Sequence, residues 1–276
     1  MTEASWVPAG LSARYTHMPH DPHASMTTAF FPLRTERLDR SQGIFSRQLP
    51  RLLAEVLEGG DVALVEWTAT KGGEVAHVLV ESSLPGDVLR EECAARNADA
   101  AVIGAVRVRA DGVLMSLTRW TNGERTPIVE VSEGSLVDTL HAVATALAAA
   151  LGISPQLGAI PPNDEAVRAW CFDRDNQVLI DVSGVDALLH REDAFRHAVD
   201  VVRAAPSWQP GRDLVQRRRE GWAKHGLCAL ADALSAAVSA ALPEALNATQ
   251  DAILTRQGDD TSLPDTLPHP LSTPSS

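Results

Sequence analysis

Two tight-turn dipeptides, Asp111-Gly112 and Asn122-Gly123, constrain the fold of this chain more than any other sequence feature. Both tolerate the positive φ values that a short β-hairpin turn requires. They separate three runs rich in β-branched and apolar residues, at positions 100–109, 113–121 and 126–131. Because each turn reverses the chain, the sequence predicts an antiparallel meander of three strands here.

Shorter strand-like and helix-like segments flank the predicted meander. Before it we expect a strand at residues 27–33, a helix at 41–58, a hairpin with strands at 61–70 and 74–82, and a short helix at 85–97. Pro50 lies inside the first helix, so we expect a kink there or a start near Leu49. After the meander, Ser135 can cap a helix that Gly152 ends. This order predicts an α/β fold, a mixed sheet with covering helices.

Proline and glycine residues at positions 153–163 predict a linker to an all-α C-terminal domain. Helical patterns follow at residues 164–180, 186–205, 209–224, 227–242 and 244–256, although 178–182 also fits a brief strand. The predicted domains are therefore 26–152 and 164–256, and Met26, where the ordered pattern begins, is a candidate initiator. Residues 1–25 and 257–276 lack a hydrophobic period, which predicts a disordered leader and a disordered tail.

The charge balance and the cysteines bear on the partners and the cellular compartment of the protein. There are 36 acidic and 24 basic side chains, a net charge of -12, which argues against nucleic-acid or anionic-membrane partners over most of the surface. Cys93, Cys171 and Cys228 form no CxxC pair. The sequence shows neither a secretory signal nor a long apolar run, so we expect a cytoplasmic protein.

Sequence motifs for the common cofactors and metals are absent. The sequence has no phosphate-binding glycine loop, dinucleotide fingerprint, HExxH motif or serine-hydrolase elbow, so we expect no cofactor. Two sets of side chains resemble metal ligands: His17, His20 and His23, and His190, Asp193 and His197. A disordered leader cannot hold ligands in place, and about 10 Å of helix separates His190 from His197. We therefore expect no metal.

Four packing and turn motifs in residues 27–152 resemble those of a known family. They are Ala29-Phe30-Phe31-Pro32-Leu33, Leu49-Pro50-Arg51-Leu52-Leu53-Ala54-Glu55, Ala98-Asp99-Ala100-Ala101-Val102-Ile103-Gly104 and Leu147-Ala148-Ala149-Ala150-Leu151-Gly152. The region resembles the N-terminal domain of TolB and the related TolB-like domains that bacteria place before tetratricopeptide repeats. The added strand at 74–82 departs from that family's pattern. The resemblance implies a TolB N-terminal-like α/β domain.

The second domain resembles a degenerate tetratricopeptide unit. Ala194, Ala198 and Pro206 match the small, apolar and terminal proline positions of that repeat, and 206–210 breaks the chain between two helices. A single repeat needs neighbours to bury its apolar face, so the flanking helices must serve as irregular partners. The two resemblances together imply a binding or scaffold protein, since neither family fold carries a catalytic centre.

A local excess of basic residues marks the candidate partner site. From Arg203 to Lys224 there are six basic and two acidic residues in an otherwise acidic chain. The candidate partner-binding residues are Trp208, Arg212, Arg217, Arg218 and Trp222. Arg218 lies on or beside the apolar stripe of its helix, so it should be paired, stacked on an indole, or turned into a groove. The alternatives are a salt bridge to Asp186 or Glu192, and a groove that binds an acidic peptide.

These observations predict a non-catalytic interaction or scaffold protein that binds an acidic protein or peptide. Two other functions stay open. A nucleic-acid-binding accessory protein would use the same arginines on phosphates, and an enzyme would have a dispersed active site that sequence motifs do not reveal. A homo-oligomer is a further expectation, because the apolar stripe of the helix at 227–242 can close the internal core or form a dimer seam. The stripe is Leu227, Leu230, Leu234 and Val238.

Overall fold

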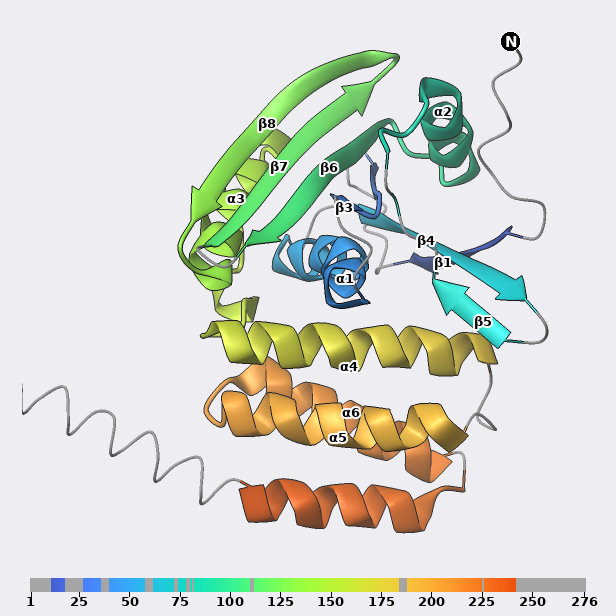
Figure 1. Ribbon diagram of the computed structural model, residues 1–276, viewed down its shortest axis with the longest axis vertical. Helices are drawn as coiled ribbons and strands as arrows, with labels where there is room; N and C mark the ends of the chain where they lie inside the picture. Colours follow the sequence, from blue (N-terminus) through green and yellow to red (C-terminus); the bar gives the residue numbers. More distant parts are fainter. Residues whose placement is uncertain are drawn as a thin grey trace, which may run out of the picture.

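An eight-stranded mixed sheet lies at the centre of the structure, with helices against both faces (Figure 1). The computed structural model describes residues 11–17, 27–35, 40–57, 62–71, 74–77, 80, 82–109, 112–183, 188–224 and 226–241. The strands are β1 (Leu11–His17), β2 (Thr28–Phe30), β3 (Arg34–Thr35), β4 (Val62–Lys71), β5 (Glu74–His77), β6 (Ala100–Arg109), β7 (Gly112–Thr121) and β8 (Glu124–Glu133). The helices are α1 (Arg40–Val56), α2 (Gly86–Ala95), α3 (Leu136–Leu151), α4 (Asp164–Ser183), α5 (Leu188–Ala204) and α6 (Gln209–Lys224), with a 3-10 turn at Leu157–Ala159 and a further helix over residues 228–241.

The strand order in the sheet is β1-β4-β2-β6-β7-β8, with β3 on β6 and β5 on β4. β2 runs parallel to β4 and β6, whereas β6, β7 and β8 pair antiparallel. At the second turn of this meander, Asn122 and Gly123 have φ values of 52° and 95°. The three-stranded meander and the mixed α/β architecture that the turns predict are therefore confirmed.

The first strand lies inside the segment that was predicted to be a disordered leader. β1 pairs antiparallel with β4, from Leu11 opposite Ala69 to His17 opposite Ala63. The prediction for 1–25 was therefore wrong at residues 11–17. Apolar and polar residues alternate there, but a segment this short forms a strand only when a neighbouring strand pairs with it. The rest of the predicted leader lies outside the described residues.

Pro50 does not start α1, which runs from Arg40 to Val56, so the alternative of a start near Leu49 was wrong. Proline has no N–H to donate to the carbonyl of Ser46, four residues earlier. That carbonyl instead accepts the N–H of Leu33 at 2.7 Å, and the Ser46 hydroxyl donates to the carbonyl of Leu33. A tertiary hydrogen bond thus replaces the missing helical one.

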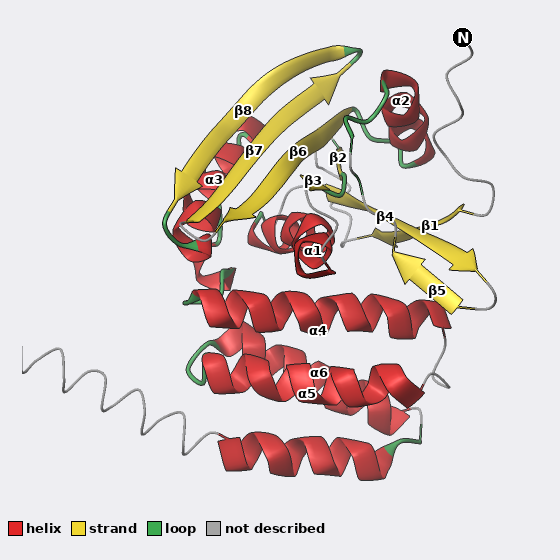
Figure 2. Ribbon diagram, in the orientation of Figure 1, coloured by secondary structure: helices red, strands yellow, loops and turns green. Residues whose placement is uncertain are grey.

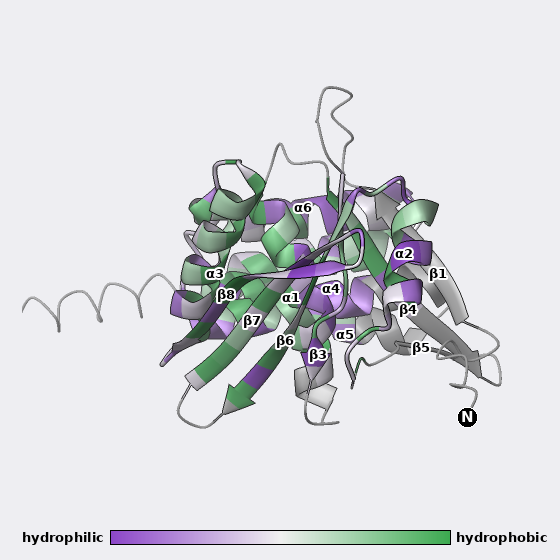
Figure 3. Ribbon diagram, turned by 90° about the horizontal axis from the view of Figure 1, so that it is seen from above, coloured by the Kyte–Doolittle hydropathy of each residue, from purple (hydrophilic) through white to green (hydrophobic). Residues whose placement is uncertain are grey.

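The sheet buries apolar side chains on both faces because neighbouring residues on a strand point in opposite directions. Phe30 and Val102 belong to the cluster that α1 and α3 cover. Their neighbours Phe31 and Ala101 belong to a second cluster, which α2 covers. α2 shows hydrophobic beside hydrophilic residues in Figure 3, as expected for a helix with a single buried face.

The predicted linker at 153–163 and the first residue of α4, Asp164, together bond to the ends of four helices. The bonds run from Gln156 N to Val56 O (2.7 Å), Asn163 Nδ2 to Ala204 O (2.9 Å), Trp208 Nε1 to Gly158 O (3.1 Å), and from the N–H groups of Leu136 and Val137 to the Asp164 carboxylate (3.0 Å each). Most of these bonds satisfy backbone groups that helix ends leave unpaired. The linker therefore has a defined place between the sheet and the C-terminal helices.

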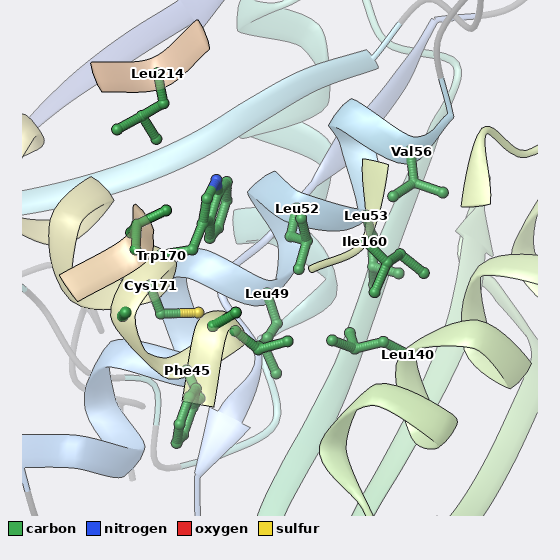
Figure 4. Packing of buried hydrophobic residues seen from close by; sticks show 14 of the residues in the cluster. Phe45, Leu49, Leu52, Leu53, Val56, Leu140, Ile160, Trp170, Cys171 and Leu214 are labelled. Atoms are coloured by element: carbon green, nitrogen blue, oxygen red, sulfur yellow. The ribbon is translucent and has the colours of Figure 1, made fainter. Parts of the chain in front are cut away.

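One hydrophobic cluster extends from the sheet into the C-terminal helices, which lie in layers below α1 (Figure 2). Trp170 and Cys171 of α4 belong to the same cluster as Phe45 and Leu49 of α1, as Figure 4 shows at close range. Leu214 of α6 belongs to it as well. The predicted boundary between 26–152 and 164–256 therefore does not separate two cores.

Ion pairs also join α1 to α4. Arg47 donates to both carboxylate oxygens of Asp175, at 2.9 and 2.8 Å. Arg174 donates to Glu55 at 3.0 Å, and its guanidinium carbon lies 5.4 Å from the ring centre of Trp170. Burial lowers the pKa of Arg174, while the Glu55 carboxylate opposes that change. These pairs fix the rotation of α4 relative to α1.

The helix over residues 228–241 packs inward. Leu234 is fully buried, and Leu227, Leu230 and Val238 pack against the core as partly buried side chains. The stripe of the predicted helix at 227–242 therefore closes the internal core. The predicted helix at 244–256 and the tail at 257–276 lie outside the described residues. Among the helices that are described, none is long and apolar enough to cross a membrane.

Candidate functional site

Arg218 lies inside the helical layer and is not available to a partner. Its side chain is 4% exposed, and its Nη1 lies 2.5 Å from Asp173 Oδ1. The guanidinium also donates to Asp173 Oδ2 at 3.0 Å, to the carbonyl of Ala194 at 2.8 Å and to Gln177 Oε1 at 3.0 Å. Of the two alternatives that the sequence left for Arg218, an internal salt bridge or a partner-binding groove, the structure shows the salt bridge. Its acid is Asp173 of α4, whereas the side chains of the expected acids Asp186 and Glu192 lie outside the described residues.

Asp173 is a completely buried acid within the helical layer. Burial raises the pKa of Asp173, and the Arg218 guanidinium, with Arg174 and His197 behind it, opposes that rise. The pair links three helices, since Asp173 belongs to α4, Arg218 to α6 and the accepting carbonyl of Ala194 to α5. A buried pair of this kind fixes the helix arrangement, but it has no face toward a ligand.

The two tryptophans of the predicted site are also buried, each with 7% of its surface exposed. The Trp208 ring packs over Gly211, where an added Cβ would lie only 2.6 Å from Cε3. Trp222 lies 6.0 Å from the guanidinium carbon of Arg218, measured to its ring centre. The prediction that Trp208, Arg218 and Trp222 form a partner surface was therefore wrong. A sequence signal for the burial of Trp208 was overlooked: Gly211, three residues later, has no side chain and so leaves room for the indole.

Arg212 and Arg217 are exposed, but they do not form one basic face. At about 100° per residue, Arg212 and Arg219 follow one flank of α6, whereas Arg217 and Lys224 follow the other. The crest between the two flanks carries Asp213, Gln216 and Glu220, and these residues take part in hydrogen bonds along the helix surface. The basic excess of α6 is thus divided into two rows by acidic and amide side chains.

A groove with a volume of about 340 Å³ lies between α5 and the helix over residues 228–241. Its apolar lining consists of Phe195, Val199, Ala237, Ala240 and Ala241. Its polar lining consists of Arg196, Asp200 and Arg203. The local charge of this lining is positive, with two arginines against one aspartate. The sequence analysis did not identify this groove, because its two walls are about forty residues apart in the chain.

The ring of His197 faces the ring of Phe172 on α4. The two rings are stacked with centres 5.2 Å apart, and His197 Nδ1 lies 3.9 Å from Asp200 Oδ2. The side chain of His190 lies outside the described residues, as do His20 and His23. No group of three metal-binding side chains occurs in the part of the chain that the structure describes.

The pKa of His197 predicts a loss of stability in mild acid. Burial lowers this pKa below 6.5, Arg196 lowers it further, and Asp200, Asp173 and Asp193 oppose the shift. The unfolded chain therefore takes up a proton at a higher pH than the folded one. As the pH falls from 7 toward the lowered pKa, we expect the free energy of unfolding to decrease. Urea unfolding measures it, and the decrease should be smaller in His197→Gln; equal pH dependence in both proteins would contradict the assignment.

Comparisons with known proteins identify no family for the chain. Neither a protein-family model nor a curated protein matches it. A PelC dodecamer from Paraburkholderia phytofirmans shares 14% identity at a TM-score of 0.29, over 50% of this chain and 95% of that one. A second PelC dodecamer from the same organism shares 15% identity at a TM-score of 0.27, over 49% and 96% of the two chains. Likeness at this level carries no argument about the fold or the function.

Proposed function

We propose that this protein is a non-catalytic interaction module that binds an acidic, amphipathic segment of a protein partner in the groove between α5 and residues 228–241. The single observation that carries the proposal is the composition of this groove, an apolar floor of about 340 Å³ with a basic rim. Helix-in-groove recognition uses such a floor for apolar anchors of the bound segment. The charges at the rim then select the sign of the partner's polar residues.

The arginines of the rim are accessible to a partner. The Arg196 and Arg203 side chains are 64% and 56% exposed. Each pairs with an aspartate three residues earlier on α5, Arg196 with Asp193 at 2.6 Å and Arg203 with Asp200 at 2.7 Å. Exposed pairs of this kind contribute only about 0–1 kcal/mol, so a carboxylate of a partner can replace the aspartates at little cost.

The positions of the side chains with shifted pKa values support a non-catalytic role. In the described part of the chain, the pKa values that depart from ordinary values belong to Cys93, Cys171, Asp173, Arg174 and His197. None of these residues lines the groove. Asp173 takes part in a buried ion pair and Arg174 in a partly buried one. Burial raises the pKa of both thiols, which makes them poor nucleophiles. The acidic net charge of -12 and the divided basic rows of α6 favour a protein partner over nucleic acid.

The proposal includes the two family resemblances. The antiparallel order of α4, α5, α6 and the helix over residues 228–241 is compatible with a degenerate tetratricopeptide-like arm on a TolB-like α/β body (Figure 1). Ala194 and Ala198, which match the small and apolar repeat positions, are both fully buried on α5. Three free cysteines are compatible with a reducing cytoplasm, where we propose that the protein acts.

Selection of peptides from a displayed random library tests the proposal. We expect the wild-type protein to enrich peptides with acidic residues beside an apolar stripe. Binding of the enriched peptides, measured by fluorescence anisotropy, should weaken at least about tenfold in Arg196→Glu/Arg203→Glu and in Ala240→Glu. The matched control is Arg90→Glu, an exposed charge reversal on α2 that should bind normally. Enrichment of basic peptides, or equal affinity in all four proteins, would disprove the proposal.

A further inference from the structure

A second hollow lies on the sheet face that carries α2. It has a volume of about 150 Å³, and strands that are distant in sequence form its walls. Ile103 and Ala105 of β6 and Ser116 and Thr118 of β7 line it beside Arg34 of β3 and Arg125 of β8. Residues 82–84, which precede α2, form the remaining rim together with Pro32 and Val80. We refer to this hollow as the sheet cleft.

The charged side chains that the structure describes in the lining of the sheet cleft are basic. Arg34 and Arg125 line it, and no aspartate or glutamate among the described residues does, although the chain as a whole has a net charge of -12. Arg125 Nη2 donates to the carbonyl of Leu84 at 2.9 Å, which holds its guanidinium at the rim. Arg34 is half-buried and has no ion-pair or hydrogen-bond partner among the described residues. A half-buried cation without a counter-ion favours the binding of an anion.

Four hydroxyl groups complete the lining of the sheet cleft, those of Ser82, Ser83, Ser116 and Thr118. Within the described part of the chain, none of them takes part in a hydrogen bond. They come from two separate segments, the rim before α2 and β7, the middle strand of the meander. Together with the two guanidinium groups they supply donors from several directions, and each hydroxyl can donate one hydrogen bond.

We infer that the sheet cleft binds the phosphate group of a small ligand. A phosphate dianion carries about two charges and three or more acceptor oxygens in a tetrahedral arrangement, which matches two guanidinium groups and several surrounding hydroxyls. A planar carboxylate has one charge and two oxygens, so it leaves part of these donors unused. The volume of about 150 Å³ accommodates the phosphate and a small attached group, while the rest of a larger ligand would remain outside.

The strand pairing explains how Arg34 and Arg125 reach one cleft. β3 pairs parallel with β6, which places Arg34 opposite Ala105. β7 lies between β6 and β8, and Arg125 pairs with Trp120 on its far edge. The two arginines therefore stand on either side of β7, the strand that supplies Ser116 and Thr118. This site is independent of the groove in the helical layer, so the two proposals fail or succeed separately.

Calorimetric titration of the full chain with inorganic phosphate, phenyl phosphate and acetate tests the inference. We expect saturable binding of phosphate, binding at least about tenfold weaker for acetate, and a loss of at least about tenfold in Arg34→Gln. Ser116→Ala/Thr118→Val should weaken phosphate binding without removing a charge, and Arg90→Gln is the control that should bind normally. Circular dichroism shows whether each variant is folded.

The outcomes separate the possible sources of the phosphate. Tighter binding of phenyl phosphate than of inorganic phosphate identifies a phosphomonoester, and the reverse order identifies free phosphate. The inference is overturned if phosphate binding is not saturable, if folded Arg34→Gln binds it as the wild type does, or if acetate binds equally well.

Discussion

Replacement of Asp173 by alanine is expected to lower the free energy of unfolding by about 3–5 kcal/mol. The reason is the position of Arg218, whose guanidinium is buried between α4, α5 and α6 and pairs with this carboxylate at 2.5 and 3.0 Å. Without Asp173, a buried positive charge keeps only the carbonyl of Ala194 and the amide of Gln177 as acceptors. Urea unfolding at pH 7, followed by circular dichroism, measures the loss.

The matched control is Asp173→Leu/Arg218→Met, which removes both charges and keeps side chains of similar size. Since the desolvation of a buried ion pair offsets much of its attraction, this double variant should recover most of the stability that Asp173→Ala loses. A double variant as unstable as Asp173→Ala would show that the loss comes from packing. A loss in Asp173→Ala of less than about 1 kcal/mol would show that Arg218 is solvated and so returns it to the list of possible partner residues.

Replacement of Trp170 by alanine is expected to lower the free energy of unfolding by about 3–5 kcal/mol as well. Trp170 is among the largest fully buried side chains and lies on α4, in the same cluster as Phe45 and Leu49 of α1 (Figure 4). The truncation leaves a cavity at the junction between the sheet and the helical layer. Calorimetry and urea unfolding measure the effect, and Val238→Ala, at the partly buried end of the last helix, is the milder comparison.

The shape of the transition in Trp170→Ala tests whether the two halves of the chain share one core. Fluorine NMR of protein labelled with 5-fluorotryptophan resolves Trp67 and Trp120, which report the sheet, from Trp208 and Trp222, which report the helical layer. With a shared core, the two signals should change together and shift by the same amount. Separate transitions, in which only the helical signal shifts, would show that the linker at 153–163 divides two independent domains after all.

Local signals determined most of the elements. Asn122-Gly123 predicted its hairpin because the dipeptide adopts positive φ, and Ser135 capped α3 through the N–H of Asp138 as its position suggested. Both effects act over a few residues and need no partner elsewhere in the chain. The strand β1 was not predicted, and a start of α1 near Leu49 was predicted wrongly, for the opposite reason. Pairing with β4 stabilises the first, and the Leu33 N–H compensates for Pro50 in the second.

The candidate site shows the same division between local signals and contacts with distant parts of the chain. The sequence showed that Arg218 lies on or beside the apolar stripe of its helix and should be paired, stacked on an indole or turned into a groove. It could not indicate Asp173, which lies forty-five residues earlier on another helix. The groove and the sheet cleft each join segments that are far apart in sequence, so no motif spacing predicts them. Arg34 and Arg125 appear as unrelated surface charges until β3 and β8 take their places in the sheet.

The sequence by itself thus determined most of the segments that form helices, strands and tight turns, since those choices depend mainly on neighbours a few positions away. It also determined the acidic charge of the chain and the local basic excess of α6. Tertiary structure alone decided which arginines are internal ion-pair partners and which line a cavity. The reason is that burial and counter-charge are properties of the packed neighbours, and these neighbours come from other parts of the chain.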